Sequence, residues 1–153
     1  MAISTGEFTS PFFLLRGYEN CWKCGNSSRV VGLASGDANS EPYVLQYIKA
    51  MPEAFLTEIH KLQPQLEYRL SQAIDASYFM NFCSCCGASI GDHYIFSQPG
   101  GAFFPITDED TQHIEVHELP FLGSFSFECT PAQGIGKAII QKGTRVSPLS
   151  SSP

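Results

Sequence analysis

The stretch that decides the fold is Cys21-Trp22-Lys23-Cys24-Gly25, whose pattern returns later in the chain as Cys83-Ser84-Cys85-Cys86-Gly87. Two thiolates separated by two residues can face one ion from a single tight turn, and zinc takes four such ligands in a tetrahedron. The glycine that ends each motif permits positive φ, so that backbone amides can point at the sulfurs. The pattern therefore predicts one structural zinc ion bound by Cys21, Cys24, Cys83 and Cys86.

The two motifs are separated by residues 25–82, a longer interval than in a compact zinc finger. We therefore expect a helix and at least one strand to be inserted between them, and one shared site in place of two incomplete ones. A redox role for Cys21 and Cys24 is disfavoured, because thioredoxin-like pairs lie at the N-terminus of a helix, whereas a strand is expected to follow this pair. Cys83 is preferred to Cys85 as the partner of Cys86, because its spacing matches that of Cys21 and Cys24. Cys85 and Cys129 are predicted to be spare thiols.

Short runs rich in β-branched and aromatic residues predict strands, and the first cysteine pair should lie at the tip of a hairpin. Phe55, Leu56, Ile59 and Leu62 recur at helical spacing after Pro52 and before Pro64, which predicts a helix. Thr107 is a plausible N-cap for a short helical turn. The expected strands cover 11–18, 28–34, 43–48, 78–82, 93–96, 114–119 and 121–129, with 66–74 left open between strand and helix.

These elements predict an α+β fold in which a small antiparallel sheet carries a zinc-ribbon-like site of two knuckles and an inserted helix. A chain with 43% hydrophobic and 12% aromatic residues can bury a core of its own. We expect one domain over residues 1–146 and a mobile tail over 147–153, where serine and proline dominate.

Composition also indicates the compartment and the partners. The chain shows neither an export signal nor an apolar run long enough to span a membrane, so we expect a cytoplasmic protein without a membrane partner. In a reducing compartment, paired cysteines favour metal binding over disulfides. The net charge of -6 disfavours nucleic acid. A nucleic-acid-binding zinc ribbon stays open as an alternative, because Arg16, Lys23 and Arg29 flank the first cysteine pair.

Two other groups of residues suggest a small enzyme as a further alternative. His113, Glu115 and His117 would share one face of a strand, although a solvated strand face is the simpler interpretation. Asp92 and His93 follow the second motif and could form an acid/base pair, but Asp92 is as well suited to bonding turn amides. Four thiolates would leave the zinc no open position for water, so no catalytic residue is assigned.

Several stretches together resemble a bacterial family of uncharacterised zinc-ribbon-like proteins. The matching residues are Cys21 to Gly25, Tyr78 to Cys83, Cys86-Gly87-Ala88, Gly91-Asp92 and Pro99-Gly100-Gly101-Ala102-Phe103-Phe104-Pro105. The resemblance implies a small metal-stabilised domain without an established activity. It supplies no catalytic residues, and Cys85 departs from its pattern.

The function favoured by the sequence is a non-enzymatic, zinc-stabilised module that binds another protein. The apolar group Ala102, Phe103 and Phe104, in a loop bounded by glycine and proline, is a candidate docking surface. The competing interpretation is that both phenylalanine rings fill the core, and burial of both rings would end the docking idea.

Overall fold

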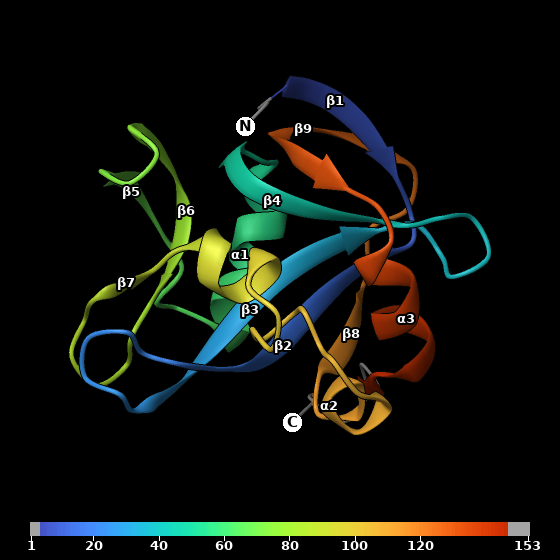
Figure 1. The fold of residues 1–153 in the computed structure, drawn as a ribbon. Coiled ribbons are helices and arrows are strands. Elements are labelled where there is room, and N and C mark those ends of the chain that lie inside the picture. The colour runs from blue at the N-terminus through green and yellow to red at the C-terminus, as the bar shows by residue number, and fades with distance from the viewer. Residues whose placement is uncertain (1–3, 147–153) are drawn as a thin grey trace.

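The computed structural model describes residues 4–146, and a seven-stranded sheet dominates it (Figure 1). The strand order is β1-β9-β4-β3-β2-β8-β10, antiparallel throughout except for the parallel pair of β8 and β10. The strands of this sheet are β1 (Ser4–Thr9), β2 (Phe12–Asn20), β3 (Ser27–Ser35), β4 (Tyr43–Ala50), β8 (Glu115–Leu119), β9 (Ser124–Ala132) and β10 (Thr144–Val146).

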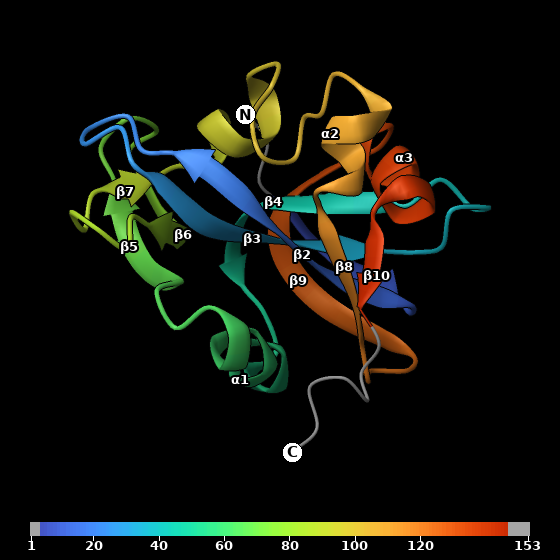
Figure 2. The same cartoon turned by 90° about the horizontal axis from the view of Figure 1, so that it is seen from below.

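The centre of this sheet is buried on both faces, as the continuous apolar run at the start of β2 requires. Phe13 and Leu15 of β2 join one core cluster, and Phe12 and Leu14 join the other. Alternate side chains of a strand point to opposite faces, so each cluster lies on its own side of the sheet. Figure 2 shows helix α1 (Glu53–Leu62) on one side and η1 (His93–Ser97), α2 (Asp108–Gln112) and α3 (Ile135–Lys142) on the other.

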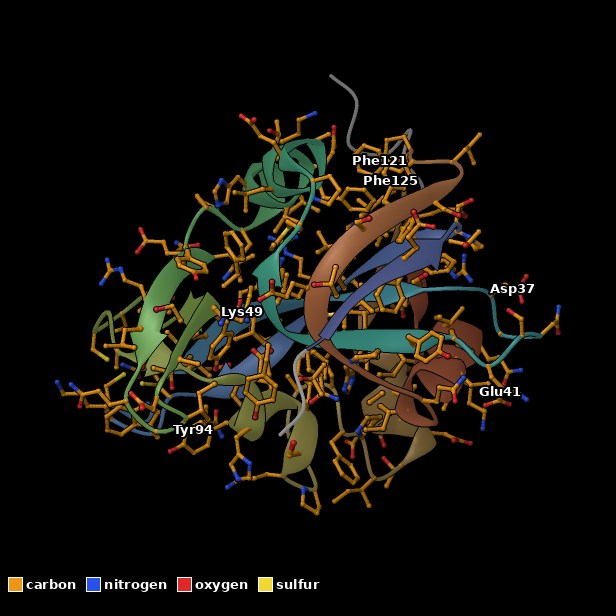
Figure 3. The ribbon with its side chains drawn as sticks, turned by 90° about the horizontal axis from the view of Figure 1, so that it is seen from above. Asp37, Glu41, Lys49, Tyr94, Phe121 and Phe125 are labelled. Carbon is orange, nitrogen blue, oxygen red and sulfur yellow. The ribbon has the colours of Figure 1, made fainter. Side chains whose placement is uncertain are left out.

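Helix α1 forms where the sequence places apolar residues at helical spacing. Its buried residues are Phe55 and Ile59, and the amide of Gln63 ends it by donating to the carbonyl of Ile59. The Phe55 ring packs edge-on against Phe12 at 4.9 Å between centroids and stacks on Phe121 at 4.1 Å. Figure 3 shows Phe121 beside this helix, which is thereby fixed to the sheet by aromatic contacts.

The opposite face of the sheet is covered by aromatic rings that need a glycine beneath them. A Cβ on Gly32 would lie 2.8 Å from the Phe96 ring and 3.1 Å from the Phe103 ring. Phe103 is fully buried and Phe104 is partly buried. The Phe103 ring therefore fills the core, and it cannot serve as an exposed docking residue.

A second, three-stranded sheet stands beside the end of the hairpin formed by β2 and β3. It consists of β5 (Glu67–Ser71), β6 (Ala76–Phe82) and β7 (Ser89–Ile90). Asn81 of β6 is buried and joins it to the large sheet, because its side chain accepts from the amide of Val31 at 2.9 Å and donates to the carbonyl of Val31 at 3.0 Å. The Asn81 side chain thus makes the two hydrogen bonds that a neighbouring strand would otherwise make with Val31 at this edge of β3.

The α+β class and most predicted elements are confirmed, including the hairpin of β2 and β3 and the N-cap of α2 by Thr107. The prediction that the antiparallel sheet is small was wrong, because seven strands join it, and the last of them, β10, pairs in parallel with β8. Residues 93–97 form a π-helix, not a strand, and the strand that returns from the second motif is β7. Strand β1, helix α3 and strand β10 were not predicted.

The predicted tail over residues 147–153 lies outside the described residues. Within residues 4–146, no helix is long and apolar enough to cross a membrane.

Candidate metal centre

The first cysteine pair lies in the turn between β2 and β3, and two backbone hydrogen bonds shape this turn. The amide of Cys21 donates to the carbonyl of Asn26 at 2.8 Å, and the amide of Gly25 donates to the carbonyl of Cys21 at 2.9 Å. Gly25 has a φ of 77°, a conformation that a residue with a Cβ adopts only with strain.

The second pair lies in the turn between β6 and β7 and repeats the same two bonds. The amide of Cys83 donates to the carbonyl of Ala88 at 2.8 Å, and the amide of Gly87 donates to the carbonyl of Cys83 at 2.9 Å. Gly87 has a φ of 78°. The repeated motif therefore produces two turns of the same geometry, which Figure 1 shows side by side at the ends of their hairpins.

The two turns bring four sulfur atoms together. The Sγ atoms of Cys21, Cys24, Cys83 and Cys86 all lie within 4.8 Å of one another. The Cys21 and Cys86 sulfurs are 3.6 Å apart, and the Cys24 and Cys83 sulfurs are 3.7 Å apart. A tetrahedron of thiolates about 2.3 Å from a zinc ion has edges of about 3.8 Å, so the arrangement fits such a metal and is too wide for disulfides.

Backbone amides favour the thiolate form of the first cysteine of each pair, Cys21 and Cys83. The amides of Cys86 and Cys85 point at the Cys83 sulfur from 3.5 and 3.4 Å and lower the pKa of that thiol to about 6. The pKa of Cys21 is also lowered, mainly by the backbone amide of Cys24. Donors of this kind offset the negative charge that four thiolates bring to one cation.

Other side chains lock the two turns against each other. The indole Nε1 of Trp22 donates to the carbonyl of Ser89 at 2.7 Å, and the amide of Ser84 donates to the hydroxyl of Ser28 at 3.1 Å. Each bond links one turn or its strand to the other hairpin. These two bonds hold the cysteine turns side by side.

The spare cysteines lie outside the cluster. Cys85 is exposed, and its sulfur accepts a hydrogen bond from the Asn26 side chain at 3.1 Å. Cys129 is fully buried in the core beneath α1, and this burial raises the pKa of its thiol to about 12. Cys129 therefore has the environment of a structural residue.

The predicted histidine and glutamate face is only partly formed. His117 Nε2 lies 2.9 Å from Glu115 Oε1 on β8, but His113 precedes the strand as the C-cap of α2. Partial burial opposes the charge of Glu115, yet the hydrogen bond from His117 and the nearby Arg16 and Arg29 lower its pKa. Arg16 and Arg29 lie 3.6 and 3.8 Å from this carboxylate, whose single negative charge offsets one of the two positive charges.

Asp92 and His93 do not form an acid/base pair. Asp92 is buried, and its carboxylate accepts a hydrogen bond from the backbone amide of Tyr47, whereas His93 is exposed. The cavity that Asp92 helps to line measures about 20 Å³, which is room for a single water molecule. Asp92 is therefore a structural acceptor in this site.

A larger cleft of about 450 Å³ opens on the side of the sheet opposite α1. It lies between the end of β2, the glycine loop around residue 101, and the junction of α2 with β8. Its lining residues are Gly17, Tyr18, Gly100, Gly101, Ala102, Pro105, Asp110, His113 and Ile114.

Sequence reasoning missed Asn81 and this cleft. Asn81 stands in a strand between Met80 and Phe82, and asparagine is uncommon in strands, so its position was a signal for a special role. The cleft had no such signal, because it depends on where β8 begins relative to β2. No family model, no curated protein and no solved structure matches this chain.

Proposed function

We propose that this protein is a non-enzymatic zinc protein that binds another protein, with one structural zinc ion coordinated by Cys21, Cys24, Cys83 and Cys86. The observation that carries the proposal is the cluster of four sulfurs at the tips of two hairpins. Four thiolates complete the coordination of zinc and leave no position for a substrate or a water nucleophile. Such an ion stabilises a fold and does not supply chemistry.

In this proposal the zinc joins two sheets. Cys21 and Cys24 follow β2 of the large sheet, and Cys83 and Cys86 follow β6 of the small sheet. Bound metal would add to the contacts of Asn81 and Trp22 between the same elements. Residues 1–146 would then act as one domain.

A reducing compartment such as the cytoplasm belongs to the same proposal. All six cysteines are free, and the four clustered sulfurs are too far apart for disulfide bonds. Oxidation would turn the ligands into disulfides and destroy the site.

The test has two parts, both on protein purified from native cells without added metal. Elemental analysis should find about one zinc per chain. Quantitative mass spectrometry of the tagged protein should recover the same partner protein in every preparation, at a yield well above that of the tag alone. Protein without metal, or protein that retains no partner under crosslinking, would contradict the respective half of the proposal.

An enzyme is the second candidate, and the cleft of about 450 Å³ is the observation that favours it, because His113 and Asp110 both line it. Asp110, however, is engaged in the cap of α2, where its carboxylate accepts from the amide of Thr107 at 3.3 Å. A nucleic-acid-binding ribbon is less well supported, because Arg16 and Arg29 both pair with Glu115 and the chain as a whole has a net charge of -6.

A further inference from the structure

Beyond the start of β8, the hairpin of β2 and β3 has two different edges. The edge formed by β3 is covered by side chains, and the edge formed by β2 is open. Strand β8 pairs with residues 12–16 of β2, and β2 continues to Asn20. Figures 1 and 2 both show the hairpin running past β8 toward the cysteine turns. On the other side, the edge of β3 is covered by Asn81, which bonds Val31, and by Gln63, which donates to the carbonyl of Arg29 at 2.8 Å.

The direction of the backbone groups on the open edge follows from the covered one. In an antiparallel pair, directly opposed residues point their amides and carbonyls either toward each other or both outward. The amide of Val31 and the carbonyl of Arg29 make their hydrogen bonds on the outer side of β3. Val31 lies opposite Arg16, and Arg29 lies opposite Tyr18. Arg16 therefore points its backbone groups toward β8, and Tyr18 points them into the space that β8 has left.

That space is the cleft of about 450 Å³, which Tyr18 and Gly17 border. Among residues 4–146, no backbone group is recorded as a partner of the amide or the carbonyl of Tyr18 on this side. Asn20, two residues further on, presents its backbone in the same direction. The opposite wall is the glycine loop, held in place because the amide of Ala102 donates to the Glu19 carboxylate at 2.8 Å.

We propose that this open edge binds an extended peptide of a partner protein, which adds to β2 as a strand and carries a lysine or arginine toward the cleft. An exposed row of amides and carbonyls is a template for such pairing. This proposal rests on the proposed function and names the class of partner for the interaction module.

Charge selects the kind of peptide. Asp110 is the charged residue among those that line the cleft, and it lies in the acidic first turn of α2 with Asp108 and Glu109. Asp108 pairs with Lys142 at 3.0 Å, and no cation within residues 4–146 is recorded beside Glu109 or Asp110. A basic side chain would complement this turn, whereas a second copy of the chain would bring the same acidic turn against its own counterpart.

The experiment selects ligands for the zinc-loaded protein from a displayed library of random twelve-residue peptides, and only afterwards measures how the selected peptides bind Tyr18→Pro. Proline removes the outward-facing amide of Tyr18 and leaves the bonds between β2 and β3 in place. The selected peptides should contain lysine or arginine and should bind Tyr18→Pro about tenfold more weakly or worse. Zinc content and the melting curve verify that the variant is folded.

N-methylated versions of a selected peptide provide a test that needs no protein variant. N-methyl groups on alternate residues that face β2 should abolish binding, and N-methyl groups on the intervening residues should leave it within about twofold. Equal sensitivity of both sets, or equal binding to Tyr18→Pro, would overturn strand addition at this edge. Selected peptides without basic residues would overturn the charge assignment.

Three further outcomes have distinct meanings. If the protein dimerises in solution and Tyr18→Pro abolishes the dimer, the occupant is a second copy and the peptide proposal is wrong. If Tyr18→Pro still retains the native partner, this surface is wrong and the interaction module stands. Absence of any native partner contradicts the proposed function itself, whatever the peptides show.

Discussion

The carboxylate of Asp92 accepts a hydrogen bond from the backbone amide of Tyr47 at 2.7 Å inside the protein. Tyr47 has a φ of 50°, which is uncommon for a bulky residue, and it lies where the pairing of β4 with β9 shifts register. The amide of Asp92 in turn donates to the Tyr78 hydroxyl at 3.0 Å. One buried residue therefore stabilises a strand irregularity and fixes the start of η1 to β6.

This carboxylate makes stability depend on pH. Burial raises the pKa of Asp92 from 3.8 to about 7, against the opposing effect of the Tyr47 amide. The folded state then holds the proton more tightly than the unfolded chain, so the free energy of unfolding should fall as pH rises from about 4 to about 7. Urea unfolding of the wild type and Asp92→Asn across this range measures the effect.

Asp92→Asn is the matched control, because its amide oxygen can still accept from Tyr47 while the side chain no longer titrates in this range. Both proteins carry the same cysteines, so the effect of acid on the metal site cancels in their difference. The difference in stability should shift in favour of Asp92→Asn as pH rises. A constant difference between pH 4 and pH 7 would show that the pKa of Asp92 is not raised in the folded protein.

The proposed metal ligands should be separable by mutation from Cys85, which lies outside the cluster. Cys24→Ser or Cys86→Ser removes one ligand and should lower zinc content from about one per chain to a small fraction, with a loss of several kcal/mol in stability. Cys85→Ser should retain the zinc content and the stability of the wild type, because the Cys85 sulfur lies outside the cluster. Elemental analysis and thermal unfolding provide the two readouts, and equal losses in all three variants would refute this ligand set.

The glycines of the two turns should be needed for their backbone conformation alone. A Cβ on Gly25 or Gly87 would meet no atom within 4 Å, but each has a φ near 78°. Alanine there should cost about 1–2 kcal/mol for the left-handed conformation, and asparagine should cost less. Chemical unfolding of Gly25→Ala and Gly25→Asn measures the difference, and equal stability of the two variants would contradict the explanation.

Asn81 should contribute more to stability than its size suggests. Asn81→Ala leaves the buried amide and carbonyl of Val31 without partners, which should cost about 2–5 kcal/mol. Hydrogen exchange of the Val31 amide should accelerate in the variant. Asn39→Ala, at an exposed loop position, is the control and should change stability by less than about 0.5 kcal/mol. A protected Val31 amide in Asn81→Ala would show that another group covers this edge.

The sequence by itself determined the features that depend on local spacing. The two C-x-x-C-G motifs placed four cysteines in matching turns, because the spacing and the glycines fix the turn conformation. The apolar runs predicted β2, β3 and α1, because periodicity follows directly from helix and strand geometry.

Only the tertiary structure decided how these pieces meet. The burial of Phe103, the role of Asn81 and the separation of His113 from Glu115 all depend on contacts between residues far apart in the chain. The cleft depends on β8 beginning opposite Arg16 while β2 runs on to Asn20, a relation of register that no single segment contains. Pairing and packing between distant segments set such features, and local residue patterns do not encode them.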